Sequence, residues 1–208
     1  MNYRRIISLA SATLVAGALI VGCSSGGSHS SMTDSSNKTI PASANFNATD
    51  VGFAQGMIPH HAQAVEMADM ALSTSTNADV LSLATKIKAA QNPEIQTMTG
   101  WLQSWDQKVP AMNSMAEGGH DMSDMSGMMM DGMMSDADMK KLESSTGTEF
   151  DRLWLELMIQ HHEGAVRMSE DEVEGGKNPD TMALAQAIIT SQQGEINTMN
   201  SLLSKLPN

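Results

Sequence analysis

The sequence predicts an all-α protein, a four-helix bundle made of two copies of a helical hairpin with a long methionine-rich loop between them. The first observation is an internal repeat: residues 50–102 align without a gap on residues 151–203, with 19 identities in 53 positions. The second is that apolar residues in both copies recur at the 3.6-residue spacing of amphipathic helices. Neither hairpin could bury its apolar stripe alone, so we expect the two to pack together.

The N-terminus predicts an exported lipoprotein. Residues 1–22 carry Arg4 and Arg5 and then an apolar run that is short and gives way at once to polar sequence, which is typical of a secretory leader. Small and aliphatic residues then lead to Cys23, as in a bacterial lipobox. We expect Cys23 to carry a lipid anchor to the bacterial cell membrane, at its extracytoplasmic face or in the periplasm. The alternative is an ordinary leader followed by an unrelated cysteine.

The remaining chain divides into a tether and the bundle. Residues 23–45 are rich in Ser and Gly and predict a flexible tether, and residues 46–208 form the bundle. Thr49 or Asp50 is expected to cap the first helix, with Gln55 and Gln63 on its outward side. Capping residues, prolines and Gly175-Gly176 set the other boundaries. The expected helices cover about 50–73, 79–108, 136–144, 148–172 and 179–205.

The net charge and the cysteine count exclude several functions. The formal net charge is −12, which repels nucleic acid and anionic membrane surfaces and leaves cations as the natural small partners. Cys23 is the only cysteine, so the chain has no intrachain disulfide. No serine lies in a nucleophile-elbow motif, and no catalytic residue is predicted.

The loop between the repeats, residues 111–139, predicts a flexible segment that binds soft metal ions. It is rich in Gly, Ser and Asp, and ten methionines lie between Met112 and Met139. Exposed methionine does not improve solubility, whereas thioethers are ligands for Cu(I). A solvated linker is the alternative. The candidate metal ligands of the loop are His120, Met122, Met125, Met128, Met129, Met130, Met133 and Met134.

A pair of adjacent histidines at the centre of each repeat predicts a second, ordered metal site. Adjacent residues are about 100° apart on a helix, so both histidines of a pair can flank an inward line. Imidazole with thioether suits copper, and Cu(I) in particular. The candidate ligands are His60, His61, His161, His162, Met57, Met67, Met98, Met158, Met168 and Met199. Four polar residues on the apolar stripes of the partner helices are expected to fix the histidines by hydrogen bonds: Gln91, Glu94, Gln192 and Glu195.

Two other interpretations compete with copper binding by an exported protein that buffers, chaperones or confers resistance to the metal. The histidines could belong to a structural His–Glu–Gln network in an interaction module that binds no metal. A ferritin-like redox enzyme is the third interpretation, but a di-iron site needs a Glu three residues before each ligating His. Those positions hold Met57, Ile58, Met158 and Ile159.

The two histidine motifs resemble those of a known family. Residues 57–67, MIPHHAQAVEM, and residues 150–166, FDRLWLELMIQHHEGAV, are similar to the signature of the DUF305 family. The resemblance extends from about Phe46 to Leu203. It implies a ferritin-like four-helix bundle, usually exported, with copper binding in some members and no defined enzymatic reaction.

Overall fold

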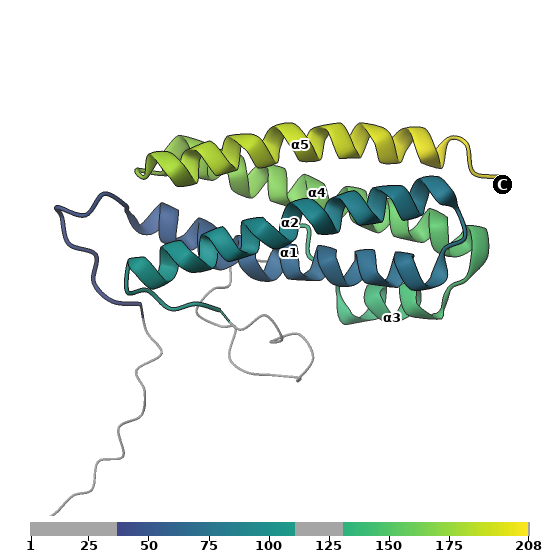
Figure 1. Ribbon diagram of the computed structural model, residues 1–208, viewed down its shortest axis with the longest axis horizontal. Coiled ribbons are helices and arrows are strands. Elements are labelled where there is room, and N and C mark those ends of the chain that lie inside the picture. The colour runs from purple at the N-terminus through teal and green to yellow at the C-terminus, as the bar shows by residue number, and fades with distance from the viewer. Residues whose placement is uncertain (1–36, 111–130, 208) are drawn as a thin grey trace, which may run out of the picture. The chain divides into compact units, whose positions relative to one another are not determined.

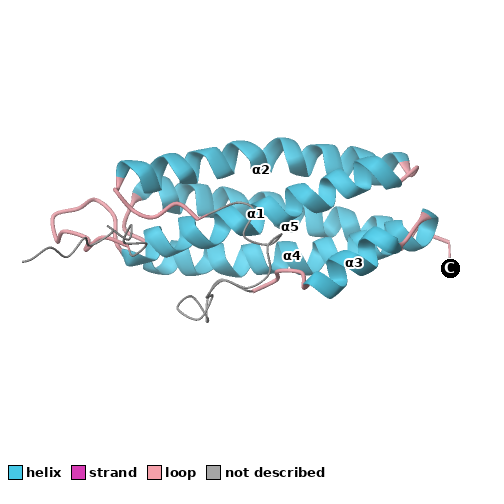
Figure 2. Ribbon diagram, turned by 90° about the horizontal axis from the view of Figure 1, so that it is seen from below, coloured by secondary structure: helices cyan, strands magenta, loops and turns pink. Residues whose placement is uncertain are grey.

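The computed structural model describes residues 37–110 and 131–207, and this part of the chain contains five helices (Figure 1). Helices α1 (Ala48–Thr74) and α2 (Ala78–Ser104) form one hairpin, and α4 (Gly147–Gly175) and α5 (Pro179–Leu203) form the other. Helices α1 and α4 pack on each other across the two hairpins, and the short α3 (Asp136–Ser144) lies against α4 (Figure 2). The predicted all-α bundle of paired helices is confirmed. No helix in the described ranges is long and apolar enough to span a membrane.

Asparagine side chains begin three of the long helices. Asn47 caps α1 and forms a capping box with Asp50, while Asn77 and Asn178 cap α2 and α5. The expectation that Thr49 or Asp50 caps α1 was therefore wrong. The Asn47 side chain accepts from the amides of Thr49 and Asp50, which satisfies donors that have no partner within the helix.

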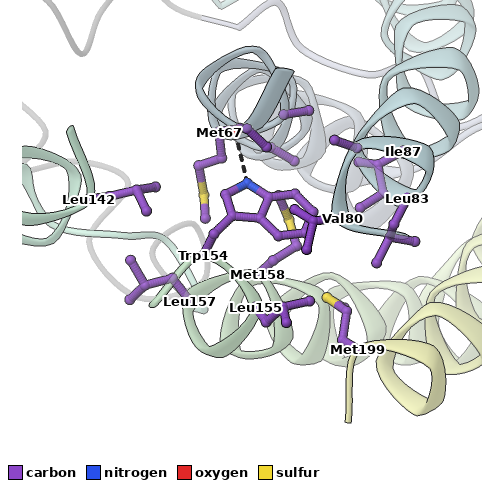
Figure 3. Close-up of a cluster of buried hydrophobic side chains, with 14 of the residues drawn as sticks. Met67, Val80, Leu83, Ile87, Leu142, Trp154, Leu155, Leu157, Met158 and Met199 are labelled. Carbon is purple, nitrogen blue, oxygen red and sulfur yellow. Dashed lines mark hydrogen bonds between the residues drawn. The ribbon is translucent and has the colours of Figure 1, made fainter. Parts of the chain in front are cut away.

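The apolar core consists of two clusters. One cluster lies between the C-terminal half of α1 and the N-terminal half of α4, and contains Trp154, whose indole Nε1 donates to the carbonyl of Met67 at 2.8 Å (Figure 3). The other lies around the N-terminal half of α1 and includes Phe53 and Ile58. Along α1 and α4 the chain passes from one cluster to the other at the paired histidines, and along α2 and α5 it does so at Gln91 and Gln192. A buried polar layer thus divides the core.

Each copy of the repeat anchors the hairpin turn of the other copy. The buried carboxylate of Asp50 accepts from the Asn178 amide at 2.8 Å and from the Thr181 hydroxyl at 2.6 Å, at the α4–α5 turn. Asp151 occupies the equivalent position in the second repeat and accepts from the Ser75 hydroxyl at 2.6 Å, at the α1–α2 turn. These reciprocal bonds fix the two hairpins against each other.

The last part of the expected tether contacts the bundle. Asn37 and Gln55 exchange side-chain hydrogen bonds of 3.0 and 2.6 Å, and Gln55 also donates to the carbonyl of Lys108 at 2.7 Å. Phe46 stacks on Trp105 with ring centroids 4.5 Å apart. The structure therefore places residues 37–46 along the bundle. It also corrects the expectation that Gln55 faces outward, since its side chain is buried.

Glu172 is a fully buried acid near the end of α4, beside the Asp50 cluster. Neither carboxylate oxygen of Glu172 has a hydrogen-bond partner in the described structure. Burial, together with the negative charge of Asp50, raises the pKa of Glu172 from 4.5 to about 8. Burial alone would also raise the pKa of Asp50, but hydrogen bonds led by Thr181 and Asn178 outweigh it and lower that pKa. Asp50 is the ionised partner, and Glu172 carries the proton.

The substitution Glu172→Gln tests this assignment. An acid whose pKa is raised in the folded state stabilises the fold fully below its unfolded pKa, and this stability is lost as pH rises through the folded pKa. The difference in the free energy of unfolding between Glu172→Gln and wild type should therefore shift in favour of the variant as pH rises from about 5 to about 8, by roughly 1–3 kcal/mol. Urea unfolding at several pH values measures the gain. Glu174→Gln, an exposed neighbour with the same charge change, is the control. A constant difference across this pH range would contradict the buried, protonated acid.

Candidate metal centre

Four histidines from α1 and α4 meet in the polar layer, and none of their side chains is exposed. His60 and His161 come from equivalent positions of the two repeats, and their ring centroids are 3.7 Å apart with the planes tilted by 41°. His61 and His162 lie on either side, with centroids 6.5 Å from His60 and 6.4 Å from His161 respectively. The structure thus brings both predicted pairs together at one level of the bundle.

Each outer histidine is held by a glutamate of its own hairpin. His61 Nε2 lies 2.7 Å from Glu94 Oε2, and His162 Nε2 lies 2.8 Å from Glu195 Oε2. The two carboxylates are partly exposed, so they reach the layer from its edge. When the imidazole is neutral, Nε2–H donates to the carboxylate and the lone pair remains on Nδ1. In both residues Nδ1 is buried and has no partner in the described structure.

The inner pair and the glutamines are less well satisfied. Both ring nitrogens of His60 and of His161 are buried without a hydrogen-bond partner in the described residues. Gln91 and Gln192 also lie at this level, yet neither forms a hydrogen bond to a histidine there. The expected His–Glu contacts are therefore present, and the expected His–Gln contacts are not. Buried polar atoms without partners are costly, and a ligand or water would relieve that cost.

Burial keeps the inner histidines neutral. Desolvation, assisted by the positive charge that His61 and His162 could carry, lowers the pKa of His60 from 6.5 to about 3. Desolvation and the charge of His60 also lower the pKa of His161 well below its usual value. Neutral imidazole is the form that binds metal ions, so protons compete weakly with a metal at these two side chains.

Buried thioethers lie on both sides of the histidine layer. Met57 and Met98 belong to one apolar cluster, while Met158 and Met199 belong to the other, as the repeat requires. Met57 and Met158 are one helical turn from His61 and His162 along their helices. The other two predicted methionines are less closely placed: Met67 is in the core near Trp154, and Met168 is half-buried.

Residues 131–134, which we call the strap, lie beside the histidines and were not predicted to have this role. Gln63 on α1 holds Met134 by two hydrogen bonds, and Arg167 on α4 pairs with Asp131. Met134 was expected in the flexible loop as a candidate metal ligand, but it is buried in the core, and Gln63 is buried although it was expected to face outward. Met133 is half-buried. His120, Met122, Met125, Met128, Met129 and Met130 lie outside the described residues, as does Cys23.

The donor set suits a soft monovalent ion better than a hard or divalent one. In residues 37–110 and 131–207, no three His, Cys, Asp or Glu side chains converge on one point where an ion could be held. Rings with centroids 3.7 Å apart are in van der Waals contact, so an ion bound by both His60 and His161 would require one ring to rotate. The unpartnered nitrogens and nearby thioethers fit Cu(I), which accepts few ligands and favours sulfur and imidazole.

Together the fold and this layer define a class of protein: a duplicated α-helical bundle with two inward histidine pairs. The chain belongs to the DUF305 family, described as a domain of unknown function, whose profile matches residues 50–203. The resemblance seen in the histidine motifs is therefore confirmed.

Solved structures of similar proteins share this fold. A DUF305 protein from Streptomyces coelicolor, described as a presumed secreted protein, is 35% identical with a TM-score of 0.66, covering 76% of this chain and 93% of that one. CopM in its Cu(II)-bound form is 32% identical with a TM-score of 0.61, covering 74% and 95%. CopM has also been solved in a Cu(I)-bound form, at 29% identity. The L153 protein of Acanthamoeba polyphaga mimivirus is 47% identical over 55 residues, so the chain spans only 36% of that relative's length.

The neutral inner histidines predict acid sensitivity of the metal-free protein. A histidine whose pKa is lowered by folding takes up its proton in the unfolded state first, so stability falls as pH drops from 6.5 towards 3. Each such group should lower the free energy of unfolding by about 1.4 kcal/mol per pH unit in this window. Guanidinium unfolding of chelator-treated protein measures the slope. The double variant His60→Gln/His161→Gln should have a much shallower slope; an unchanged slope would show that other groups cause the acid loss.

Proposed function

We propose that the protein is an exported copper-binding protein that buffers, chaperones or detoxifies the metal, and that the histidine layer is its ordered binding site. The observation that carries the proposal is the set of buried imidazole nitrogens without partners, with buried thioethers one helical turn away along α1 and α4. Desolvated polar atoms of this kind cost stability unless a ligand uses them. The copper-bound forms of CopM, a similar protein of the same fold, support copper as the ligand.

Within this proposal each residue has a role. His60, His61, His161 and His162 supply nitrogen, Met57 and Met158 supply sulfur, and Glu94 and Glu195 fix the outer rings. Residues of both hairpins would hold the metal, at the layer where α1 and α4 meet. Met98 is in the same apolar cluster as Met57, and Met199 is in the same cluster as Met158, so these two are further candidate ligands. Met67 and Met168 are further from the histidines along their helices.

A structural module that binds no metal is the second candidate, and one observation favours it. The outer histidines already have glutamate partners, and no three His, Cys, Asp or Glu side chains of the described ranges converge. The unpartnered inner pair argues against it, because a purely structural network would be expected to satisfy its members. No feature of the described residues favours the third candidate, a redox enzyme.

Thioether removal distinguishes the first two candidates. Met57→Leu/Met158→Leu conserves volume and should leave the fold intact, at a cost below about 1.5 kcal/mol per site. If the two sulfurs ligate Cu(I), affinity should fall at least about tenfold, which corresponds to about 1.4 kcal/mol. Competition with a chromogenic Cu(I) chelator measures the affinity.

Met70→Leu/Met139→Leu is the matched control, since both residues are partly buried on the core and neither is a proposed ligand. We propose that the loop binds further Cu(I) ions more weakly, because each binding event must order the chain. Replacing residues 112–130 with a Gly/Ser segment of equal length removes this contribution, so that binding at the histidine layer is measured alone. Equal affinity of both methionine variants and wild type would exclude the two sulfurs as ligands, and no Cu(I) binding by the loop-replaced protein would favour the structural module.

The leader and anchor form part of the same proposal. Residues 1–22 are removed, Cys23 carries the lipid, residues 23–45 connect it to the bundle of residues 46–208, and the protein faces the periplasm or cell exterior. The secreted description of the Streptomyces coelicolor relative supports export. Metabolic labelling with an alkyne palmitate analogue should mark wild type and leave Cys23→Ser unlabelled. Labelling that persists in Cys23→Ser would exclude this anchor.

A further inference from the structure

Within the part of the chain that the structure describes, the inner histidines have no exposed surface, so an ion that reaches them must pass a part of the protein that moves. His60 and His161 are fully buried between α1 and α4. Separating the helices would break both apolar clusters. The strap, residues 131–134, lies along the α1–α4 seam at the level of the histidines, and one of its two described attachments is exposed, so it is less costly to displace than either helix.

The strap is held at its two ends, and the two attachments differ in strength. At its buried end, Gln63 Nε2 donates to the Met134 carbonyl at 2.9 Å and the Met134 amide donates to Gln63 Oε1 at 2.7 Å. At its other end, Arg167 forms a two-point ion pair with Asp131, including Nη2 to Oδ1 at 2.7 Å, but both side chains are about half exposed, at 50% and 48%. Exposed ion pairs are weak, so the strap should release at Asp131 first.

The strap fits against α4 only because two glycines face each other. A Cβ on Gly164 would lie 2.2 Å from the Asp131 carbonyl oxygen, and a Cβ on Gly132 would lie 2.7 Å from the Gly164 Cα. Gly132 also has a φ of +79°, which favours glycine. Gly164 is one turn beyond His161, so the contact is next to the inner pair.

The internal repeat indicates that these positions are specialised. Gly164 aligns with Gln63, and Arg167 aligns with Glu66. The two copies share both histidines and the following Ala and Val, yet they differ at the residues that hold the strap. One copy supplies the amide that binds Met134, and the other supplies the glycine and the arginine that receive residues 131–132.

We infer that the strap is a latch over the histidine layer and that the Arg167–Asp131 pair controls how often it opens. The latch sets the rate at which small reagents and metal ions reach His60 and His161, and it leaves the equilibrium affinity of the layer nearly unchanged. That metal ions use this route rests on the proposed function; access of other reagents does not.

Covalent labelling of metal-free protein tests access without any metal. Diethyl pyrocarbonate acylates neutral imidazole, and peptide mass spectrometry reports the rate at each histidine pair. Arg167→Ala should raise the acylation rate of the peptides that contain His60 and His161 by about two- to fivefold, the size expected from loss of an exposed ion pair that holds the strap closed. Gly164→Ala should raise it further, since the added Cβ displaces the Asp131 carbonyl and alanine is a better helix former.

Lys88→Ala is the matched control. It breaks the exposed Lys88–Asp69 ion pair between α1 and α2 and changes the net charge by the same amount as Arg167→Ala. It should leave the acylation rates at wild-type values. Arg167→Lys, which keeps the charge but loses the two-point geometry, should give an intermediate rate. Equal acylation in Arg167→Ala and Lys88→Ala would overturn the latch, as would a rise that follows the fraction of globally unfolded protein measured by urea unfolding.

Stopped-flow transfer of Cu(I) from a chromogenic chelator separates the latch from the proposed function. Arg167→Ala should raise the association and dissociation rates of Cu(I) together, by the factor found in acylation, with the dissociation constant within about twofold of wild type. Faster acylation with no Cu(I) binding by wild type would support the latch and remove the copper site. A change in the dissociation constant alone, with unchanged rates of acylation, would overturn the latch and leave the copper site standing.

Discussion

The constraint on which this structure depends is the burial of four imidazoles at one level of the bundle. The layer interrupts an otherwise apolar core, so each long helix changes from one cluster to the other where it crosses the layer. Burial of polar groups costs several kcal/mol unless they are bonded, and here only the outer rings have bonds. The two apolar clusters and the reciprocal bonds of Asp50 and Asp151 offset that cost by holding the hairpins together from both sides of the layer.

Duplication explains why the layer is nearly symmetric and where it is not. The equivalent contacts His61–Glu94 and His162–Glu195 have nearly the same length, 2.7 and 2.8 Å. The symmetry breaks at Gln63 and Gly164, where the chain that joins the copies must pass. It breaks again at Glu172, which aligns with Ala71 and introduces a buried acid at one end only. The two copies are joined by one connecting segment, and its last residues lie along the α1–α4 seam, so equivalent positions of the two copies have different neighbours there.

Periodicity predicted those parts of the structure that depend on local pattern. The helix ranges, α3 included, and the inward histidines follow from spacing and caps, because an apolar stripe selects the face that packs. The glutamates at the layer were predicted for the same reason. Gln55 and Gln63 were misplaced because a helical wheel treats a polar residue off the stripe as exposed, whereas segments 37–46 and 131–134 cover them. Met134 was misplaced for the same physical reason. Contacts made by irregular segments have no period from which to predict them.

The choice of ion follows from the dielectric environment of the layer. Moving an ion into a low-dielectric site costs free energy that rises with the square of its charge, so a monovalent ion enters more readily than a divalent one. Neutral imidazoles and thioethers supply no charge to compensate, and the two glutamates are at the edge, about one-fifth exposed, where water screens them. A divalent ion would therefore be expected to draw the glutamates inward or to bind closer to them, whereas Cu(I) is compatible with the central rings. The layer thus has hard oxygen ligands at its edges, in the two glutamates, and softer nitrogen and sulfur ligands towards its centre.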